Sequence, residues 1–186
     1  MRIAVDFDKT LFDCDSRFYQ LVNRFLPKSH TNTLTYTPLN CVERKDNLIT
    51  KLYNKLFYFT NVDKYTEYNN ALRSINLLES QGQEVIILCS RPLYQLSIIS
   101  LKDLARLHNI DEKRIIINCN NKVEYCKLFH IDLIIDNDPD ICLEAKYSGL
   151  NSICFTNNNY DGINTINSWN GILSYLSSAD QQNQKI

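Results

Sequence analysis

Five short apolar runs along the chain predict buried β-strands. Each run is rich in Ile or Val and shows no alternation of apolar and polar residues. This pattern is typical of strands that are buried on both faces of a parallel sheet. The runs are Ile3–Val5, Val85–Cys89, Ile115–Ile117, Leu133–Ile135 and Ser152–Phe155.

Segments with helical spacing lie between these runs. Ala71, Ile75 and Leu78 recur at intervals of four and three residues, which predicts a helix over 68–81. Similar spacing predicts helices over 93–107 and 122–129, one that begins at Pro139, and a last one that contains Trp169 and Leu176. Strands that alternate with helices form βαβ units, so the sequence predicts an α/β fold with a Rossmann-like parallel sheet.

Residues at the helix ends support these assignments. Gly82 and Gly149 follow predicted helices and suit the left-handed conformation that often ends a helix. Asp138 precedes Pro139, an order typical of an N-cap followed by the first helical residue. Ser168 is expected to cap the last helix.

The stretch 15–66 breaks the alternation. Phe18, Leu21 and Phe25 follow helical spacing, and a second helical pattern spans 48–56. The stretch also holds eight basic and four acidic residues in a chain with a net charge of -1. We therefore expect a small helical cap over 15–66, inserted after the first strand into a core formed by 1–14 and 67–180. Residues 181–186 form a polar tail.

Composition narrows the class of protein. With 186 residues, 44% of them hydrophobic and 22% charged, the chain suits one globular domain with an insertion. No run approaches the ~18 apolar residues that span a bilayer, and acidic residues interrupt the N-terminal apolar stretch, unlike in a signal peptide. The net charge of -1 argues against a protein that coats duplex nucleic acid. Seven cysteines without C-x-x-C spacing indicate free buried thiols and a cytoplasmic protein.

Polar residues follow the predicted strands where those strands end. Asp6 and Asp8 come after the first run, Ser90 and Arg91 after the second, and Asp136 after the fourth. Ligands of open parallel sheets bind beyond the carboxyl ends of the strands. We therefore expect these side chains to lie together.

Phosphoryl transfer suits this set of residues. Asp6 is placed to attack phosphorus and form an aspartyl-phosphate, and Asp8 to act as general acid and base. Ser90 is expected to donate to a phosphate oxygen, and Lys122 to neutralise charge in the transition state. Arg91 is expected either to contact the phosphate or to pair with a local acid. Because carboxylates repel a phosphate dianion, a hard cation such as Mg²⁺ is needed, with Asp6 and Asp136 as ligands.

Four motifs in this order resemble those of the haloacid dehalogenase (HAD) superfamily. The segment Asp6-Phe7-Asp8-Lys9-Thr10 resembles its D-x-D-x-T first motif, with Thr10 grouped among the substrate-binding residues. The segment Leu88–Pro92 resembles the second motif, and Lys122, in preference to Lys127, the third-motif lysine. The segment Ile134–Asp140 resembles the acidic fourth motif, although Asn137 stands where many relatives have Asp.

The resemblance implies a core with the first strand central, a C1-type cap and a Mg²⁺-dependent phosphatase. It implies that Asp6, the backbone carbonyl of Asp8 and a fourth-motif acid hold the metal. Asp136 and Asp140 are assigned to that acidic role, with Asp138 as the alternative to Asp140.

Within the superfamily the chain looks most similar to 5′(3′)-deoxyribonucleotidase-like phosphatases. The expected substrate is a small phosphomonoester, with a (deoxy)nucleoside monophosphate as first choice. Two alternatives stay open: a polynucleotide 3′-phosphatase, and a non-catalytic binding protein on a HAD scaffold. The sequence leaves the oligomeric state open.

Overall fold

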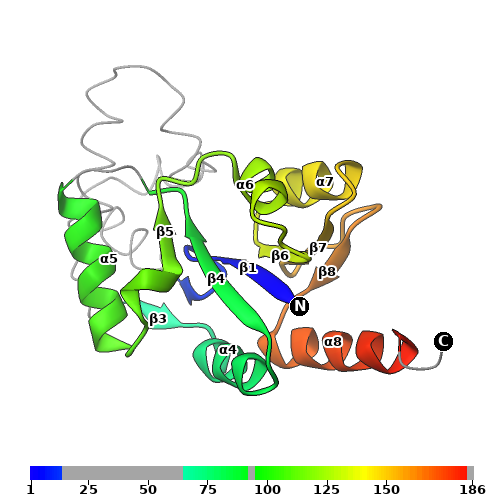
Figure 1. The fold of residues 1–186 in the computed structure, drawn as a ribbon, viewed down its shortest axis with the longest axis horizontal. Helices are drawn as coiled ribbons and strands as arrows, with labels where there is room; N and C mark the ends of the chain where they lie inside the picture. The colour runs from blue at the N-terminus through cyan, green and yellow to red at the C-terminus, as the bar shows by residue number, and fades with distance from the viewer. Residues whose placement is uncertain (14–64, 92–94, 184–186) are drawn as a thin grey trace, which may run out of the picture.

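The computed structural model describes residues 1–13, 65–91 and 95–183. They form an α/β fold whose main sheet has six parallel strands in the order β5-β4-β1-β6-β7-β8 (Figure 1). The Rossmann-like parallel sheet expected from the sequence is confirmed. The strands are β1 (Arg2–Asp6), β4 (Glu84–Cys89), β5 (Ile115–Ile117), β6 (Leu133–Asp136), β7 (Asn151–Phe155) and β8 (Asn164–Ile166).

Strand β1 lies inside the sheet, between β4 and β6. Its register places Ala4 beside Ile86 on one side and Ile134 on the other. Ile3 and Val5 belong to one apolar cluster and Ala4 to a second, so both faces of the strand are covered. All three side chains are fully buried, as the uninterrupted apolar run predicts. A strand held on both edges and both faces gives Asp6, its last residue, a fixed position.

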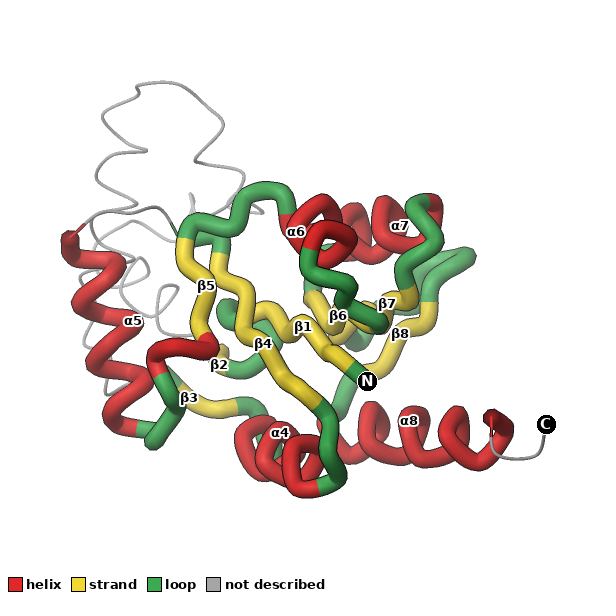
Figure 2. The backbone as a smooth tube through the Cα atoms, viewed as in Figure 1, coloured by secondary structure: helices red, strands yellow, loops and turns green. Residues whose placement is uncertain are grey.

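Five described α-helices cover the two faces of the sheet (Figure 2). Apolar side chains of α4, α5 and α8 pack with Ile3 and Val5 on one face. Those of α6 and α7 pack with Ala4 on the other. The helices are α4 (Ala71–Ser80), α5 (Gln95–Leu107), α6 (Lys122–Leu128), α7 (Pro139–Tyr147) and α8 (Trp169–Asn183); a 3-10 turn spans Glu112–Arg114.

The residues predicted to cap or end helices are confirmed in those roles. Gly82 and Gly149 adopt positive φ angles of 83° and 78° just beyond α4 and α7. Asp138 caps α7 by accepting from the backbone N–H of Asp140, with Pro139 as the first helical residue. The Ser168 hydroxyl accepts from the N–H of Gly171 at the start of α8. Local sequence thus sets the boundaries of these helices.

Three features of the fold differ from the sequence-based expectation. Strand β8 has only three residues, two of them polar, and lies at the sheet edge, so it has no apolar run that marks it. A small antiparallel pair, β2 (Phe12–Asp13) and β3 (Thr66–Glu67), joins residues on either side of the predicted cap. Helix α8 continues to Asn183, into the predicted polar tail, because no Gly or Pro follows Gly171 to stop it.

Several expectations fall outside the described residues. The helical cap over 15–66 is described only at Tyr65 and Thr66, and Cys14 and Cys41 also lie outside. The other five cysteines are free and buried, as expected. Among the described helices, none is long and apolar enough to cross a membrane.

Candidate active site

The ends of two neighbouring strands, β1 and β6, bring two of the predicted acidic residues together. Asp6 is the last residue of β1 and Asp136 the last of β6, and the two strands pair in parallel. Lys122 is the first residue of α6 and reaches the same place from the loop beyond β5. Parallel strands end at one edge of the sheet, so residues far apart in sequence meet there.

Lys122 bridges the two carboxylates. Its Nζ donates to Asp6 Oδ1 at 2.6 Å and to Asp136 Oδ2 at 2.7 Å. Asp6, Lys122 and Asp136 are only 5%, 3% and 1% exposed. The alternative third-motif residue, Lys127, lies exposed in the last turn of α6. A buried ammonium shared by two carboxylates leaves the trio with one net negative charge.

Burial and the neighbouring charges shift the pKa values of both Asp6 and Lys122. Burial raises the pKa of Asp6 to about 7; Lys122 opposes the rise, and the Asp136 carboxylate adds to it. Burial disfavours the Lys122 ammonium, but the two carboxylates outweigh that effect, and the pKa of Lys122 is raised above its ordinary value. Lys122 therefore stays charged and holds the nucleophile candidate in place.

The turn after β1 is built around Asp6. Lys9 adopts a left-handed φ of 66°, and its N–H donates to the carbonyl of Phe12 at 2.8 Å. The buried Thr10 hydroxyl donates to Asp6 Oδ2 at 3.1 Å. From α8, Trp169 Nε1 donates to the Thr10 carbonyl at 3.0 Å. Thr10, predicted to bind substrate, here positions the Asp6 carboxylate, and Trp169 supports the turn.

Asp8 lies in a different environment, bound to Arg91. The guanidinium donates through Nε to Asp8 Oδ2 at 2.8 Å and through one terminal nitrogen to Oδ1 at 2.5 Å. Arg91 is 2% exposed, and its guanidinium carbon lies 5.5 Å from the ring centres of both Phe7 and Tyr65. Of the two roles expected for Arg91, the structure shows the pairing with a local acid.

Ser90 lies at the end of β4, half-buried. Its hydroxyl donates to the backbone carbonyl of Cys119 at 3.0 Å, which ties the loop after β4 to the loop after β5. A phosphate contact by Ser90 stays a prediction.

The four acidic residues expected to hold Mg²⁺ do not form one cluster of side chains, and their role as metal ligands stays a prediction. Within 1–13, 65–91 and 95–183, no three His, Cys, Asp or Glu side chains gather in a metal-binding group. Asp136 uses one oxygen for Lys122 and accepts from the N–H of Asp138 with the other, at 2.9 Å. Asp140 is exposed in the first turn of α7, where a carboxylate favours the helix dipole. The Asp138 side chain caps α7, so its carboxylate is also engaged away from the site.

A different set of groups fits Mg²⁺. The Asn137 side-chain amide places one terminal atom 3.3 Å from Asp6 Oδ2 and 3.1 Å from the backbone carbonyl oxygen of Asp8. Neighbouring ligands of an octahedral Mg²⁺ lie about 3.0 Å apart, since each oxygen is about 2.1 Å from the ion. With the amide oxygen inward, these three groups would hold the ion. They include the Asp8 carbonyl expected from the resemblance, but an amide in place of the fourth-motif acid.

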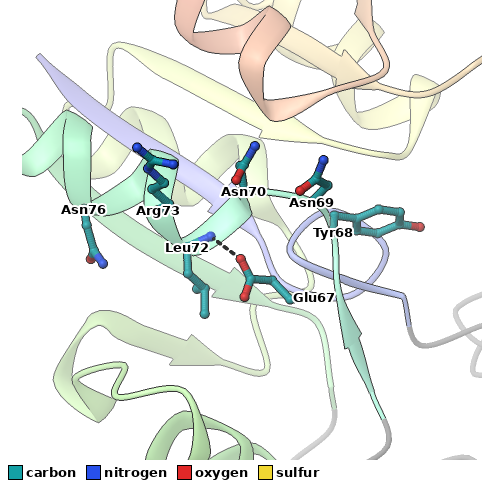
Figure 3. Close-up of a pocket in the computed structure, with 7 residues that line it drawn as sticks. All are labelled: Glu67, Tyr68, Asn69, Asn70, Leu72, Arg73 and Asn76. Atoms are coloured by element: carbon teal, nitrogen blue, oxygen red, sulfur yellow. Dashed lines mark hydrogen bonds between the residues drawn. The ribbon is translucent and has the colours of Figure 1, made fainter.

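The described residues form one hollow beside Asn137 and another at the start of α4. One, of about 230 Å³, is lined by Asn137 and Lys9 together with Tyr68, Phe155, Thr156, Asn157 and Asn167. The other, of about 490 Å³, lies at the start of α4, where Glu67 accepts from the N–H of Leu72 (Figure 3). Its lining includes Arg73 and no residue predicted for the site. The smaller hollow is therefore the one that adjoins the candidate catalytic groups.

Sequence reasoning missed two features of the site. From the sequence alone, Asn137 is a departure from the family pattern. Its place between Asp136 and Asp138, just after β6, could have indicated that it faces the site. The support of Thr10 by Trp169 joins residues 159 positions apart, and no local pattern indicates it. The pairing of Arg91 with Asp8 was one of two alternatives and needed the structure to decide.

Comparison with solved structures identifies the fold. It resembles a HAD-superfamily hydrolase of subfamily IA, variant 1, from Geobacter sulfurreducens, with a TM-score of 0.60, 11% identity, and 94% of this chain and 95% of that chain covered. A family IA, variant 3 HAD hydrolase from Entamoeba histolytica gives a TM-score of 0.65, 12% identity, and coverage of 91% and 93%. A provisionally named β-phosphoglucomutase from Thermotoga maritima gives a TM-score of 0.67 and 13% identity, with 95% of this chain and 98% of that chain covered.

No family model and no curated protein matches the sequence. At identities this low the likeness shows the fold alone: a six-stranded parallel sheet with helices on both faces, as in HAD hydrolases.

Proposed function

We propose that the chain is a HAD-superfamily phosphatase that hydrolyses small phosphomonoesters with Mg²⁺ through an aspartyl-phosphate on Asp6. The observation that carries the proposal is the setting of Asp6. It ends the buried strand β1, one oxygen accepts from Lys122, and the other lies 3.3 Å from the Asn137 amide, which also lies close to the Asp8 carbonyl. Structural carboxylates at turns rarely have this combination of burial, a dedicated ammonium and convergent oxygen groups.

The first half of the reaction transfers the phosphoryl group. An Asp6 oxygen attacks phosphorus and the bond from phosphorus to the leaving oxygen breaks. Asp8, which must enter this step protonated, gives that oxygen its proton. Lys122 offsets the negative charge of the attacking Asp6 and of Asp136. Mg²⁺, when bound, supplies the positive charge that lets a carboxylate approach a phosphate dianion.

The second half restores the enzyme. Asp8 takes a proton from water, the water oxygen attacks phosphorus, and the bond to Asp6 breaks to release inorganic phosphate. Asp8 must therefore exchange protons with substrate and water, and its side chain is 20% exposed against 6% for Asp6. Arg91 acts as a positioning residue that sets the orientation of the Asp8 carboxylate.

The leaving group is assigned to the hollow beside Asn137. Its lining includes the side chains of Asn157, Asn167 and Thr156, together with Lys9. Amide and hydroxyl groups suit a leaving group that carries hydroxyls, such as a sugar, and a lysine suits one with a further negative charge. A (deoxy)nucleoside monophosphate is the first choice, on the strength of the motif resemblance in the sequence.

We assign the protein to the cytoplasm. Support comes from the thiols: Cys89, Cys119, Cys126, Cys142 and Cys154 are free and buried. Burial raises the pKa of the Cys89 thiol, which keeps it protonated and unreactive. Buried protonated thiols fit a reducing compartment.

Phosphate release from a panel of substrates tests the proposal. The panel contains 5′- and 3′-nucleoside monophosphates, sugar phosphates and a 3′-phosphorylated oligonucleotide, each with Mg²⁺ and with EDTA. We expect release that requires Mg²⁺ and falls at least about 10³-fold in Asp6→Asn. Glu144→Gln, at an exposed position of α7, is the matched control and keeps the activity.

The ranking of substrates then identifies the leaving group. Preference for the oligonucleotide would replace the small-substrate assignment with a polynucleotide 3′-phosphatase. Absence of release from every substrate by folded protein would contradict the phosphatase and favour a binding role on this fold.

A further inference from the structure

Lys9 has an unusual backbone conformation beside the candidate catalytic groups. Its φ of 66° lies in the left-handed region, which is unfavourable for residues with a Cβ atom and which glycine adopts freely. Of the five described residues other than glycine with positive φ, three are asparagines, a residue type that tolerates this region. A lysine gains nothing from the conformation itself. Strained residues gather at functional sites, so the conformation favours a role for the Lys9 side chain.

Hydrogen bonds on both sides of Lys9 fix its backbone. The N–H of Lys9 donates to the carbonyl of Phe12 at 2.8 Å. The next residue, Thr10, is fully buried, and its hydroxyl donates to Asp6. The turn that positions the Asp6 carboxylate therefore also sets the direction in which the Lys9 side chain leaves the backbone.

The Lys9 side chain lines the hollow that adjoins Asn137. One part of this hollow is aromatic, because the rings of Tyr68 and Phe155 meet edge to face with their centres 5.1 Å apart. Among the described residues that line the hollow, only Lys9 carries a charge. The hollow thus offers one cation to its occupant. Its other lining residues carry amides and a hydroxyl: Asn137, Thr156, Asn157 and Asn167.

The charges beside the hollow make this cation important. Asp6 and Asp136 share the ammonium of Lys122, which leaves one net negative charge, and Arg91 balances Asp8. The phosphoryl dianion and a bound Mg²⁺ cancel in this balance. A leaving group with an anionic group of its own would be repelled unless a further cation faced that group.

The size of the hollow limits the length of the leaving group. A volume of about 230 Å³ holds about eight water molecules, at about 30 Å³ each. An anionic group that reaches Lys9 inside the hollow is therefore only a few bonds away from the leaving oxygen.

We propose that Lys9 is a specificity-determining residue that binds a second anionic group, a phosphate or a carboxylate, on the leaving group of a small phosphomonoester. The inference deepens the proposed function and rests on it. The Lys9 ammonium donates to the second anionic group while the phosphoryl group lies at Asp6. A neutral leaving group of the same shape lacks this contact and binds less tightly. Among nucleotides, the same contact favours a bisphosphate over a monophosphate.

Three phosphomonoesters with the same three-carbon skeleton test the assignment. Glycerol phosphate has a neutral leaving group, 3-phosphoglycerate has one with a carboxylate, and glycerol 1,3-bisphosphate has one with a second phosphate. For the wild type we expect kcat/KM to be at least about tenfold higher on an anionic compound than on glycerol phosphate, after correction for the two equivalent phosphates of the bisphosphate. The anionic compound with the higher value identifies the group as a carboxylate or a phosphate.

Variants of Lys9 test whether this residue causes the preference. Lys9→Met removes the ammonium and keeps the length of the side chain, so the preference should fall at least about tenfold. The loss should appear in KM more than in kcat, because the contact is to a part of the substrate that does not react. Lys9→Arg keeps a positive charge that can donate to either anion, and it should keep the preference within about threefold. Lys127→Met, which removes an exposed lysine of α6, is the matched control and keeps the wild-type preference.

Thermal unfolding separates binding from a role in the fold. Glycine adopts the left-handed conformation freely, so Lys9→Gly should melt at or above the wild-type temperature and still lose the preference. A lower melting temperature together with an unchanged preference would assign Lys9 to the fold and overturn the inference.

The remaining outcomes separate the inference from the proposed function. Equal kcat/KM of the wild type on all three compounds, or an unchanged preference in Lys9→Met, would overturn the role of Lys9 and leave a phosphatase. Hydrolysis of p-nitrophenyl phosphate that requires Asp6, without release from either anionic compound, would overturn it as well. Absence of release from every compound would contradict the phosphatase activity on which the inference rests.

Discussion

The two carboxylates of the first motif differ sharply although they stand two residues apart. The Asp6 side chain is 6% exposed and shares one ammonium with Asp136, so its surroundings keep a net negative charge. Asp8 is 20% exposed and has the whole guanidinium of Arg91, so its charge is balanced. The first setting suits a group that stays in place and attacks, and the second suits a group that must reach substrate and water. The difference teaches that the surroundings, more than the residue type, assign the roles.

Removal of the shared ammonium should have the largest effect. Lys122→Met leaves Asp6 and Asp136 buried without a cation, and we expect a loss of about 3–5 kcal/mol in the free energy of unfolding. Urea denaturation measures it. Phosphatase activity should fall at least about 10²-fold.

Lys127→Met is the matched control, since Lys127 lies exposed on the same helix. Equal stability of the two variants would show that Lys122 does not hold the carboxylates together.

Weakening the ion pair between Asp8 and Arg91 should lower kcat by an intermediate amount, and the size of the loss should depend on the leaving group. An ammonium cannot reproduce the two-point contact of the guanidinium, so Arg91→Lys should misorient Asp8. We expect kcat to fall about tenfold to a hundredfold on alkyl phosphates, which need a proton on the leaving oxygen. The activity on p-nitrophenyl phosphate should change little.

Steady-state kinetics on both substrates check this prediction. Arg114→Lys, in an ion pair with Glu79 outside the site, is the control. An equal loss on both substrates would mean that Arg91 acts only on the fold.

Loss of the support from α8 should have the smallest effect. Trp169→Phe removes the donor to the Thr10 carbonyl, and a buried acceptor left without its donor costs about 1–3 kcal/mol. Thermal denaturation measures the change, and activity should fall less than tenfold, since Asp6 keeps Lys122. Tyr175→Phe on the same helix should change stability by no more than about 0.5 kcal/mol. A large loss of activity in Trp169→Phe would give Trp169 a direct role at Asp6.

The fold could be predicted where burial or local backbone chemistry produces a recognisable pattern of residues along the sequence. Runs such as Ile3–Val5 mark strands covered on both faces, and Gly82 and Asp138 mark helix ends through local backbone chemistry. Strand β8 left no such pattern, because an edge strand with Asn164 and Thr165 needs no apolar run. Its position depends on hydrogen bonds to β7.

The sequence was enough to predict which residues at the strand ends belong to the candidate site. Asp6, Lys122 and Asp136 meet because parallel strands end together, which is a consequence of topology. The partners of each group were not predictable in this way. Whether Arg91 binds Asp8, and whether Asn137 or Asp140 faces the Asp8 carbonyl, depends on side-chain directions in three dimensions.

The most direct test of the central claim is to trap the phosphoryl group on Asp6. Asp8→Asn lacks the base for the second step, so with Mg²⁺ and p-nitrophenyl phosphate it should accumulate the covalent intermediate. After an acid quench, mass spectrometry should find one phosphoryl group on the N-terminal peptide that contains Asp6, and none in Asp6→Asn/Asp8→Asn. Phosphate release without any modified peptide, or a phosphoryl group on another residue, would contradict the account.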